Sequence, residues 1–241
     1  MVWCILFPVL GIISLVFFLK ERIRKASALS LIWKTLTSLW FLALAFCAVW
    51  KASEKEASAG FSLLVLAGLF CGLLGDIWLD LKWNCPEYEV QYTFAGFWSF
   101  AAGHGFFLAA LLIWQWRGEG IWWILVPLVL AAILGIAVGC SGRLMHLDYG
   151  RYKGITMFYG GMLIATALLS GSLLIRSGFK NTALWMFFTG AVLFLISDLI
   201  LSGTYFGTGK RRSKDIISNH IFYYAAQYII AGTAMVYAAG I

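Results

Sequence analysis

Long apolar runs separated by short polar links make up the chain. Eight runs of about 20 residues can be drawn, and a helix of about 20 apolar residues is what crosses the hydrocarbon core of a bilayer. The links are polar, as in KASEKEAS at residues 51–58 and RGEG at 117–120. The pattern therefore predicts an all-α polytopic membrane protein with a single integral membrane domain. The predicted transmembrane helices are residues 2–19, 29–50, 59–81, 93–116, 121–139, 154–175, 183–203 and 218–239.

The composition supports lipid as the solvent of this chain. Apolar residues make up 62% of the 241 residues, only 12% are charged, and the mean hydropathy is +0.87. A soluble domain usually carries about 25% charged residues, so this chain has too few to cover a globule in water. The net charge of +7 would suggest nucleic acid in a soluble protein. Here we assign the excess Lys and Arg to cytoplasmic loops and expect no nucleic-acid partner.

Charge alternates between the links. The links after the first, third, fifth and seventh runs hold most of the Lys and Arg residues. Cytoplasmic loops carry this excess, so we predict that these links face the cytoplasm and that both termini lie outside. The compact loops favour a bacterial inner membrane over a eukaryotic endomembrane. The five Cys residues make no C-x-x-C, and the three His residues have no metal-ligand spacing, so we expect no metal and no cofactor.

Two apolar runs carry an aspartate near their ends. They are CGLLGDIWLDL at residues 71–81, with Asp76, and LFLISDLILSG at 193–203, with Asp198. A charged side chain at the centre of a membrane helix costs at least ~2.5 kcal/mol, so such residues usually face a bundle interior or a wet cavity. The runs that follow also look alike, FWSFAAGH at 97–104 and IFYYAAQ at 221–227. We interpret the pattern as a parallel 4+4 duplication with one site between the halves.

The predicted topology places further polar groups at a similar depth. Asp76 and Asp198 lie about five residues from the cytoplasmic ends of their helices, and His104 lies near mid-membrane. The same side of the membrane also holds Lys34, Gln227, Tyr152 and Lys153. We therefore predict a pocket that opens to the inner leaflet or the cytosol.

Each of these residues also has a simpler explanation. Lys34 either pairs with Asp76 or Asp198 or extends along its methylene stem to the interface. Asp80 shares a helix face with Asp76, but its place at the helix end favours simple solvation. Gln227 would serve equally as a hydrogen bond between helices. A purely structural Lys–Asp pair, or a core histidine at His104, remains open. His146, Asp148 and His220 lie in or beside links, and we assign them no role.

Four motifs resemble one known family. They are LLGD at residues 73–76, F-x-x-G-H at 100–104, GAVLFLISDLIL at 190–201 and YYAAQYII at 223–230. Together with length and helix count, they resemble the YhhN-like lysoplasmalogenase family of integral membrane proteins. The resemblance implies hydrolysis of the vinyl-ether bond of lysoplasmalogens to a fatty aldehyde and glycerophospho-choline or -ethanolamine. It also implies that Asp76 and Asp198 are the key acids, with His104, Gln227 and Lys34 nearby.

Vinyl-ether hydrolysis needs one acid that is protonated near neutral pH and one anion beside the developing cation. Paired carboxylates divide such roles in glycoside hydrolysis. We assign the two roles to Asp76 and Asp198 without deciding which is which, and we expect His104 to orient water or relay a proton. The predicted substrate-binding residues are Lys34, Gln227, Tyr224, Asp80, Tyr152 and Lys153. Lys153, Arg151 and Arg143 are candidates to bind the lipid phosphate.

The expected partners are therefore a lysophospholipid substrate and membrane lipids. Replacing Asp76 or Asp198 by Asn is expected to abolish turnover without preventing insertion. The alternative function is a proton-coupled transporter or binding protein for a lipid or small amphiphile, since intramembrane Asp and His also suit that class. A scaffold with no ligand would require both acids to be dispensable.

Overall fold

The computed structural model describes residues 2–53, 56–115, 120–142, 144–207 and 212–239. Within these ranges, eight helices are long and apolar enough to cross a membrane. They are α1 (Trp3–Arg24), α2 (Ala28–Ala52), α3 (Glu56–Asn84), α4 (Glu89–Gln115), α5 (Trp122–Cys140), α6 (Lys153–Arg176), α7 (Thr182–Phe206) and α8 (Ser213–Ala239). Two 3₁₀ turns, η1 (Pro86–Tyr88) and η2 (Gly150–Tyr152), precede α4 and α6. The all-α class with eight membrane-spanning helices is confirmed.

Several helices continue beyond their apolar runs. α1 extends five residues further than predicted, to Arg24, and α8 begins five residues earlier, at Ser213. A helix hydrogen-bonds its own backbone, so it does not have to end where the apolar residues end. The extension of α1 matters because Arg22, which the sequence pattern placed in a link, is a helical residue in the structure.

Local capping fixes where the site-bearing helix α2 begins. Ser27 accepts a hydrogen bond from the backbone N–H of Ser30 at 3.3 Å, and the Ser30 hydroxyl accepts one from the N–H of Ser27 at 3.0 Å. This reciprocal pair satisfies backbone groups that the first turn leaves without partners. It sets Lys34 two turns into α2, where its side chain is buried.

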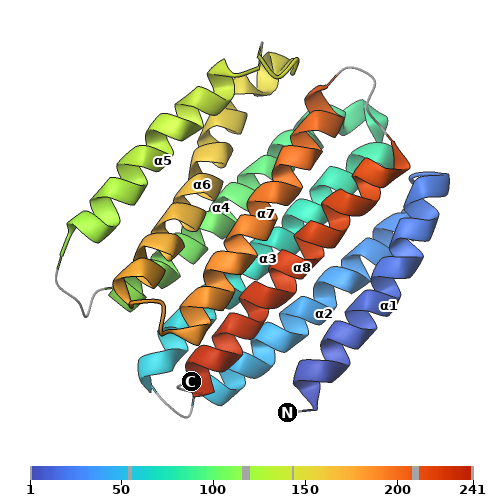
Figure 1. The fold of residues 1–241 in the computed structure, drawn as a ribbon. Helices are drawn as coiled ribbons and strands as arrows, with labels where there is room; N and C mark the ends of the chain where they lie inside the picture. The colour runs from blue at the N-terminus through green and yellow to red at the C-terminus, as the bar shows by residue number, and fades with distance from the viewer. Residues whose placement is uncertain (1, 54–55, 116–119, 143, 208–211, 240–241) are drawn as a thin grey trace.

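The helices form a bundle with α1 and α5 at opposite edges (Figure 1). α2 packs against α1, α3 and α8, whereas α6 packs against α5, α4 and α7. The two edge helices are the least covered, with 17% and 22% of their apolar windows buried. In a 4+4 duplication α2 would correspond to α6 and α8 to α4, and the packing of α2 on α8 does resemble that of α6 on α4. The duplication itself stays a prediction. The N- and C-termini lie at the same end of the bundle (Figure 1).

Glycines let two helix pairs approach closely. A Cβ added at Gly103 of α4 would lie 2.9 Å from the carbonyl oxygen of Gly68 on α3. A Cβ at Gly135 of α5 would lie 2.7 Å from the Cα of Gly161 on α6. Small residues at such crossings allow the backbone contact by which membrane helices associate. These pairings hold α4 and α6, which flank the site, in fixed positions.

Candidate active site

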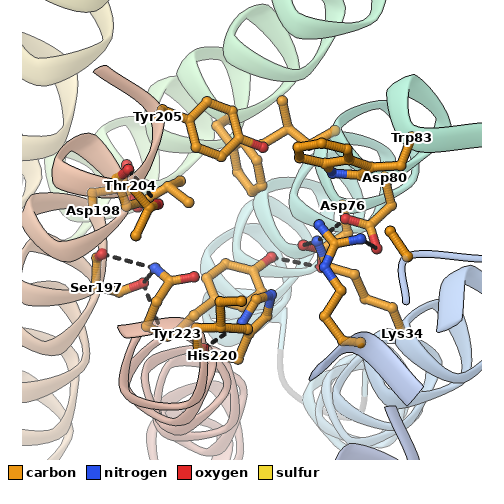
Figure 2. A pocket seen from close by; sticks show the side chains of 17 residues that line it. Lys34, Asp76, Asp80, Trp83, Ser197, Asp198, Thr204, Tyr205, His220 and Tyr223 are labelled. Carbon is orange, nitrogen blue, oxygen red and sulfur yellow. Dashed lines mark hydrogen bonds and ion pairs between the residues drawn. The ribbon is translucent and has the colours of Figure 1, made fainter. Parts of the chain in front are cut away.

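A chamber of about 260 Å³ lies at the end of the bundle opposite the two termini (Figure 2). Its walls come from the ends of α1, α3 and α7 and the beginnings of α2 and α8. Asp76 and Asp198 both line it, from opposite sides (Figure 2). The structure therefore brings the two predicted acids to a single cavity.

One wall of the chamber holds a compact cluster of ions. The Lys34 ammonium lies 3.2 Å from Asp76 Oδ1 and 3.1 Å from Asp80 Oδ1. The Arg22 guanidinium lies 3.6 Å from Asp80 Oδ2. Two carboxylates thus face two cations at this wall, and the three α2 and α3 residues are almost fully buried. Burial of this kind is tolerated when each charge has a partner.

This cluster decides two alternatives that the sequence left open. Lys34 pairs with Asp76 and Asp80 and does not extend to the interface. Asp80 is 2% exposed, so its interpretation as a solvated helix-end residue is wrong. The physical reason is that α1 continues as a helix to Arg24, so that the Arg22 side chain reaches the carboxylate, while Lys34 approaches it from α2.

A second layer of hydrogen bonds fixes Asp76. Its Oδ2 accepts from the hydroxyls of Ser38, at 2.7 Å, and Tyr223, at 2.8 Å. Tyr223 in turn accepts a hydrogen bond from Gln227 Nε2 at 2.9 Å. The hydroxyl of Tyr224 donates to the backbone carbonyl of Lys34 at 3.2 Å. Tyr223 lines the chamber, whereas Gln227 and Tyr224 lie behind it and hold its wall in place.

The wall formed by α7 is built differently. Asp198 is partly exposed to the chamber, and the Tyr159 hydroxyl of α6 interacts with its carboxyl group. Among the described residues, no Lys, Arg or His side chain forms an ion pair with Asp198. The neighbouring Ser197 and Asn219 exchange hydrogen bonds of 2.8–3.1 Å, which tie α7 to α8 (Figure 2).

His104 lies outside the chamber. Its Nδ1 is 3.0 Å from the Thr166 hydroxyl, and among the described residues its Nε2 has no hydrogen-bond partner. Its ring packs against Phe194 at 4.8 Å and Tyr159 at 6.0 Å between centroids. His104 therefore reaches Asp198 only through Tyr159, and its role in orienting water or relaying a proton stays a prediction.

The histidine that lines the chamber is His220, and not His104 as predicted from the sequence. It is 8% exposed, lines the cavity, and packs edge-on against Phe18 at 4.8 Å. Its Nδ1 lies 2.7 Å from the Ile216 carbonyl oxygen. That contact requires a proton on Nδ1, which leaves Nε2 as the acceptor of a neutral ring.

The remaining predicted binding residues lie further out. Tyr152 lines a separate outer pocket of about 250 Å³ together with Arg151 and Lys82. Lys153 is exposed and lines none of the three described cavities, and Arg143 lies outside the described residues. Tyr205 borders both this outer pocket and the chamber.

Sequence reasoning missed several residues of the chamber. Ser38 lies four residues after Lys34, and Tyr223 four residues before Gln227, so each shares a helix face with a residue already selected. That spacing was a usable signal. Arg22 had no such signal, because it belongs to a basic run that the positive-inside pattern explains completely. Tyr159 had none either, since it lies in an ordinary apolar stretch of α6.

Comparison with known proteins gives one match. A family model described as the YhhN family matches residues 29–234, which include every lining residue of the chamber named above except Arg22. No curated protein and no solved structure matches the chain.

Proposed function

Since the chain belongs to the YhhN family, we propose that it is an ether hydrolase that cleaves the vinyl-ether bond of lysoplasmalogens. The products would be a fatty aldehyde and glycerophosphocholine or glycerophosphoethanolamine. The observation that carries this proposal is the chamber in which two aspartates face one another in unlike surroundings. Asp76 has a cation and two hydroxyl donors, whereas Asp198 has a phenol and no ion-pair partner among the described residues.

In the proposed reaction Asp198 is the acid. Its carboxyl proton goes to the β-carbon of the vinyl ether, and the α-carbon and ether oxygen become an oxocarbenium ion. Water adds to the α-carbon and returns a proton to the Asp198 carboxylate. The resulting hemiacetal breaks its bond to the glycerol oxygen, and its hydroxyl proton moves to that oxygen. The sum is one water consumed and one aldehyde and one alcohol formed.

Asp76 is the anion in this scheme. Lys34, Ser38 and Tyr223 all stabilise its charged form. Facing the substrate from the opposite wall, it would stabilise the positive charge that develops on the oxocarbenium ion. A preorganised charge acts strongly in such a site because it does not have to reorient during the reaction.

One cation in the lining of the chamber suits a phosphodiester. Arg22 lines the chamber, and its guanidinium lies 5.2 Å from the centre of the Trp83 ring, with one carboxylate contact at 3.6 Å. Arginine binds phosphate well because its planar fork presents several N–H donors. Arg22 is therefore the proposed contact for the headgroup phosphate, in place of the more distant Lys153.

We also propose that this end of the bundle faces the cytoplasm of a bacterial inner membrane. The links at this end carry most of the Lys and Arg residues, as cytoplasmic loops do. Labelling of single cysteines with a membrane-impermeant reagent tests the orientation. A cysteine at Glu87 should react only in inverted vesicles.

The direct test of function is incubation of the purified protein with a lysoplasmalogen in detergent, with no ion gradient. Aldehyde should form, and in D₂O the aldehyde, trapped at once by reduction, should carry one deuterium at its second carbon. No aldehyde with any vinyl-ether lysolipid would contradict the proposal. Uptake of unchanged lipid into proteoliposomes would instead identify a transporter.

A further inference from the structure

A second, smaller cavity lies beside the chamber. This slot has a volume of about 80 Å³ and lies between α6 and α7, with contributions from α4 and α5. Leu199, which is 54% exposed, stands at its rim. The slot therefore opens sideways, towards the surface that lipid tails cover in a membrane.

Helix α7 is the partition between the slot and the chamber. Asp198, Leu201 and Tyr205 line both cavities. Their spacing of three and four residues makes one stripe along the helix. Asp198 is therefore one of three side chains at the boundary between the slot and the chamber.

The slot is lined mainly by apolar side chains, with two hydroxyl groups near one end. Thr156 and Ser202 lie near the end of the bundle that holds the chamber, whereas Leu163, Ile164 and Leu195 lie towards the middle of the bundle. The Thr156 hydroxyl is buried and, among the described residues, has no hydrogen-bond partner. A buried unpaired hydroxyl is costly, so it points to a hydrogen-bonding group of a ligand at this end of the slot.

We infer that the slot holds the first few carbons of the hydrocarbon chain of an amphiphilic substrate whose polar part occupies the chamber, and that the rest of the chain leaves past Leu199 into the lipid. This inference rests on the proposed function and adds the path of the chain to it. With the chain in the slot and the glycerophosphate in the chamber, the bond that joins them lies at Asp198. The chain then points to the middle of the membrane, as in an undisturbed lipid.

Gly160 offers a way to fill the slot without disturbing the fold. It lines the slot, and an added Cβ would meet Val138 at 3.6–3.9 Å, an ordinary van der Waals contact. Gly160→Leu would occupy the space of the chain. The matched control is Gly60→Leu, since Gly60 is an exposed residue of α3 with nothing within 4 Å of its added Cβ. Both changes replace a helical glycine by the same side chain.

The readout is binding, measured apart from turnover. The probe is a saturated alkyl-ether lysophosphatidylcholine with a photoactivatable diazirine within the first few carbons of its chain, which the proposed reaction cannot cleave. Crosslinks should map to the α6 and α7 residues of the slot. Gly160→Leu should lower the yield by about tenfold, the factor expected when roughly two methylenes lose their burial, and Gly60→Leu should not. For a probe with a chain too short to enter the slot, Gly160→Leu should lower the crosslinking yield much less.

If Gly160→Leu does not fold, Leu199→Trp at the lipid-facing rim serves instead, since an exposed position tolerates a larger side chain. Crosslinks elsewhere, or equal losses in the slot and control variants, would overturn the inference. Aldehyde formation in that case would leave the proposed function standing. Crosslinks in the slot without aldehyde formation would overturn the proposed function, whereas the inference that the slot binds the hydrocarbon chain would stand.

Discussion

The two aspartates of the chamber have similar sequence contexts and different surroundings. Each follows a small residue near the end of an apolar helix, Gly75 before Asp76 and Ser197 before Asp198. Asp76 lies within 3.2 Å of an ammonium group and accepts two hydroxyl hydrogen bonds. Asp198 faces Tyr159 without an ion-pair partner among the described residues. The helices packed around each aspartate, and not its own motif, decide what it can do.

This difference separates the ionic and the reactive parts of the site. The cluster on α1, α2 and α3 is balanced in charge, so it can stay buried without a ligand. The α7 wall leaves one carboxyl group between a polar chamber and an apolar slot. An acid that donates a proton to carbon is best placed there, because neighbouring cations would hold it in its charged form.

Removing the acid on α7 should have the largest effect. We expect Asp198→Asn to lower turnover by about 10²–10⁴-fold, the usual contribution of a general acid. Its stability should stay close to that of the parent, because no ion pair is lost. Aldehyde release and thermal unfolding in detergent measure the two quantities. The control is Asp215→Asn, which breaks an exposed pair with Arg212 outside the chamber and should leave turnover unchanged.

Changes in the ion cluster on the opposite wall should mainly affect the stability of the protein. We expect Lys34→Met to lower the free energy of unfolding by about 3–5 kcal/mol, because it leaves Asp76 and Asp80 buried without their shared cation. Adding Asp76→Asn should recover part of this loss. Lys20→Met, at an exposed position, is the control. An unchanged stability in Lys34→Met would show that the cluster is not held by this charge.

Two adjacent tyrosines give a finer comparison. Tyr223→Phe removes a hydrogen bond to a carboxylate and should cost about 1.5–3 kcal/mol, the range for bonds to charged groups. Tyr224→Phe removes a bond to a backbone carbonyl and should cost about 0.5–1.5 kcal/mol. Denaturation of both variants side by side measures the difference. Equal costs would contradict a charged Asp76.

Gln227 should show the smallest effect. Its amide donates one neutral hydrogen bond to Tyr223, and among the described residues its carbonyl oxygen has no partner. Gln227→Leu should therefore change stability by about 1 kcal/mol or less and turnover only slightly. A large rise in KM would instead support the sequence-based prediction that Gln227 binds substrate.

The sequence was sufficient for the fold and insufficient for the helix ends. Run length alone predicts eight spans, because the bilayer requires about 20 apolar residues per helix. The length of an apolar run does not show whether the helix continues into the polar residues beside it. This is why Arg22 was assigned to a link, although it lines the chamber. His220 lies near the start of its predicted run and was given no role because it stands beside a link, although it also lines the chamber.

For the site, the sequence pattern predicts how deep each polar residue lies in the membrane but not the direction in which its side chain points. Topology placed Lys34, Asp76 and Asp198 in one layer, and the structure puts all three in the lining of one chamber. Which aspartate Lys34 approaches depends on how α2 is rotated against α3, which no linear pattern records. The same limit placed His104 in the site when its ring points towards Thr166 and Phe194.

The most direct measurement is infrared spectroscopy of the purified protein near neutral pH, because protonated carboxyl groups absorb apart from carboxylates. We expect a protonated carboxyl band in the parent that disappears in Asp198→Asn and persists in Asp76→Asn. A band that persists in Asp198→Asn and disappears in Asp76→Asn would contradict the assignment of the acid and the anion.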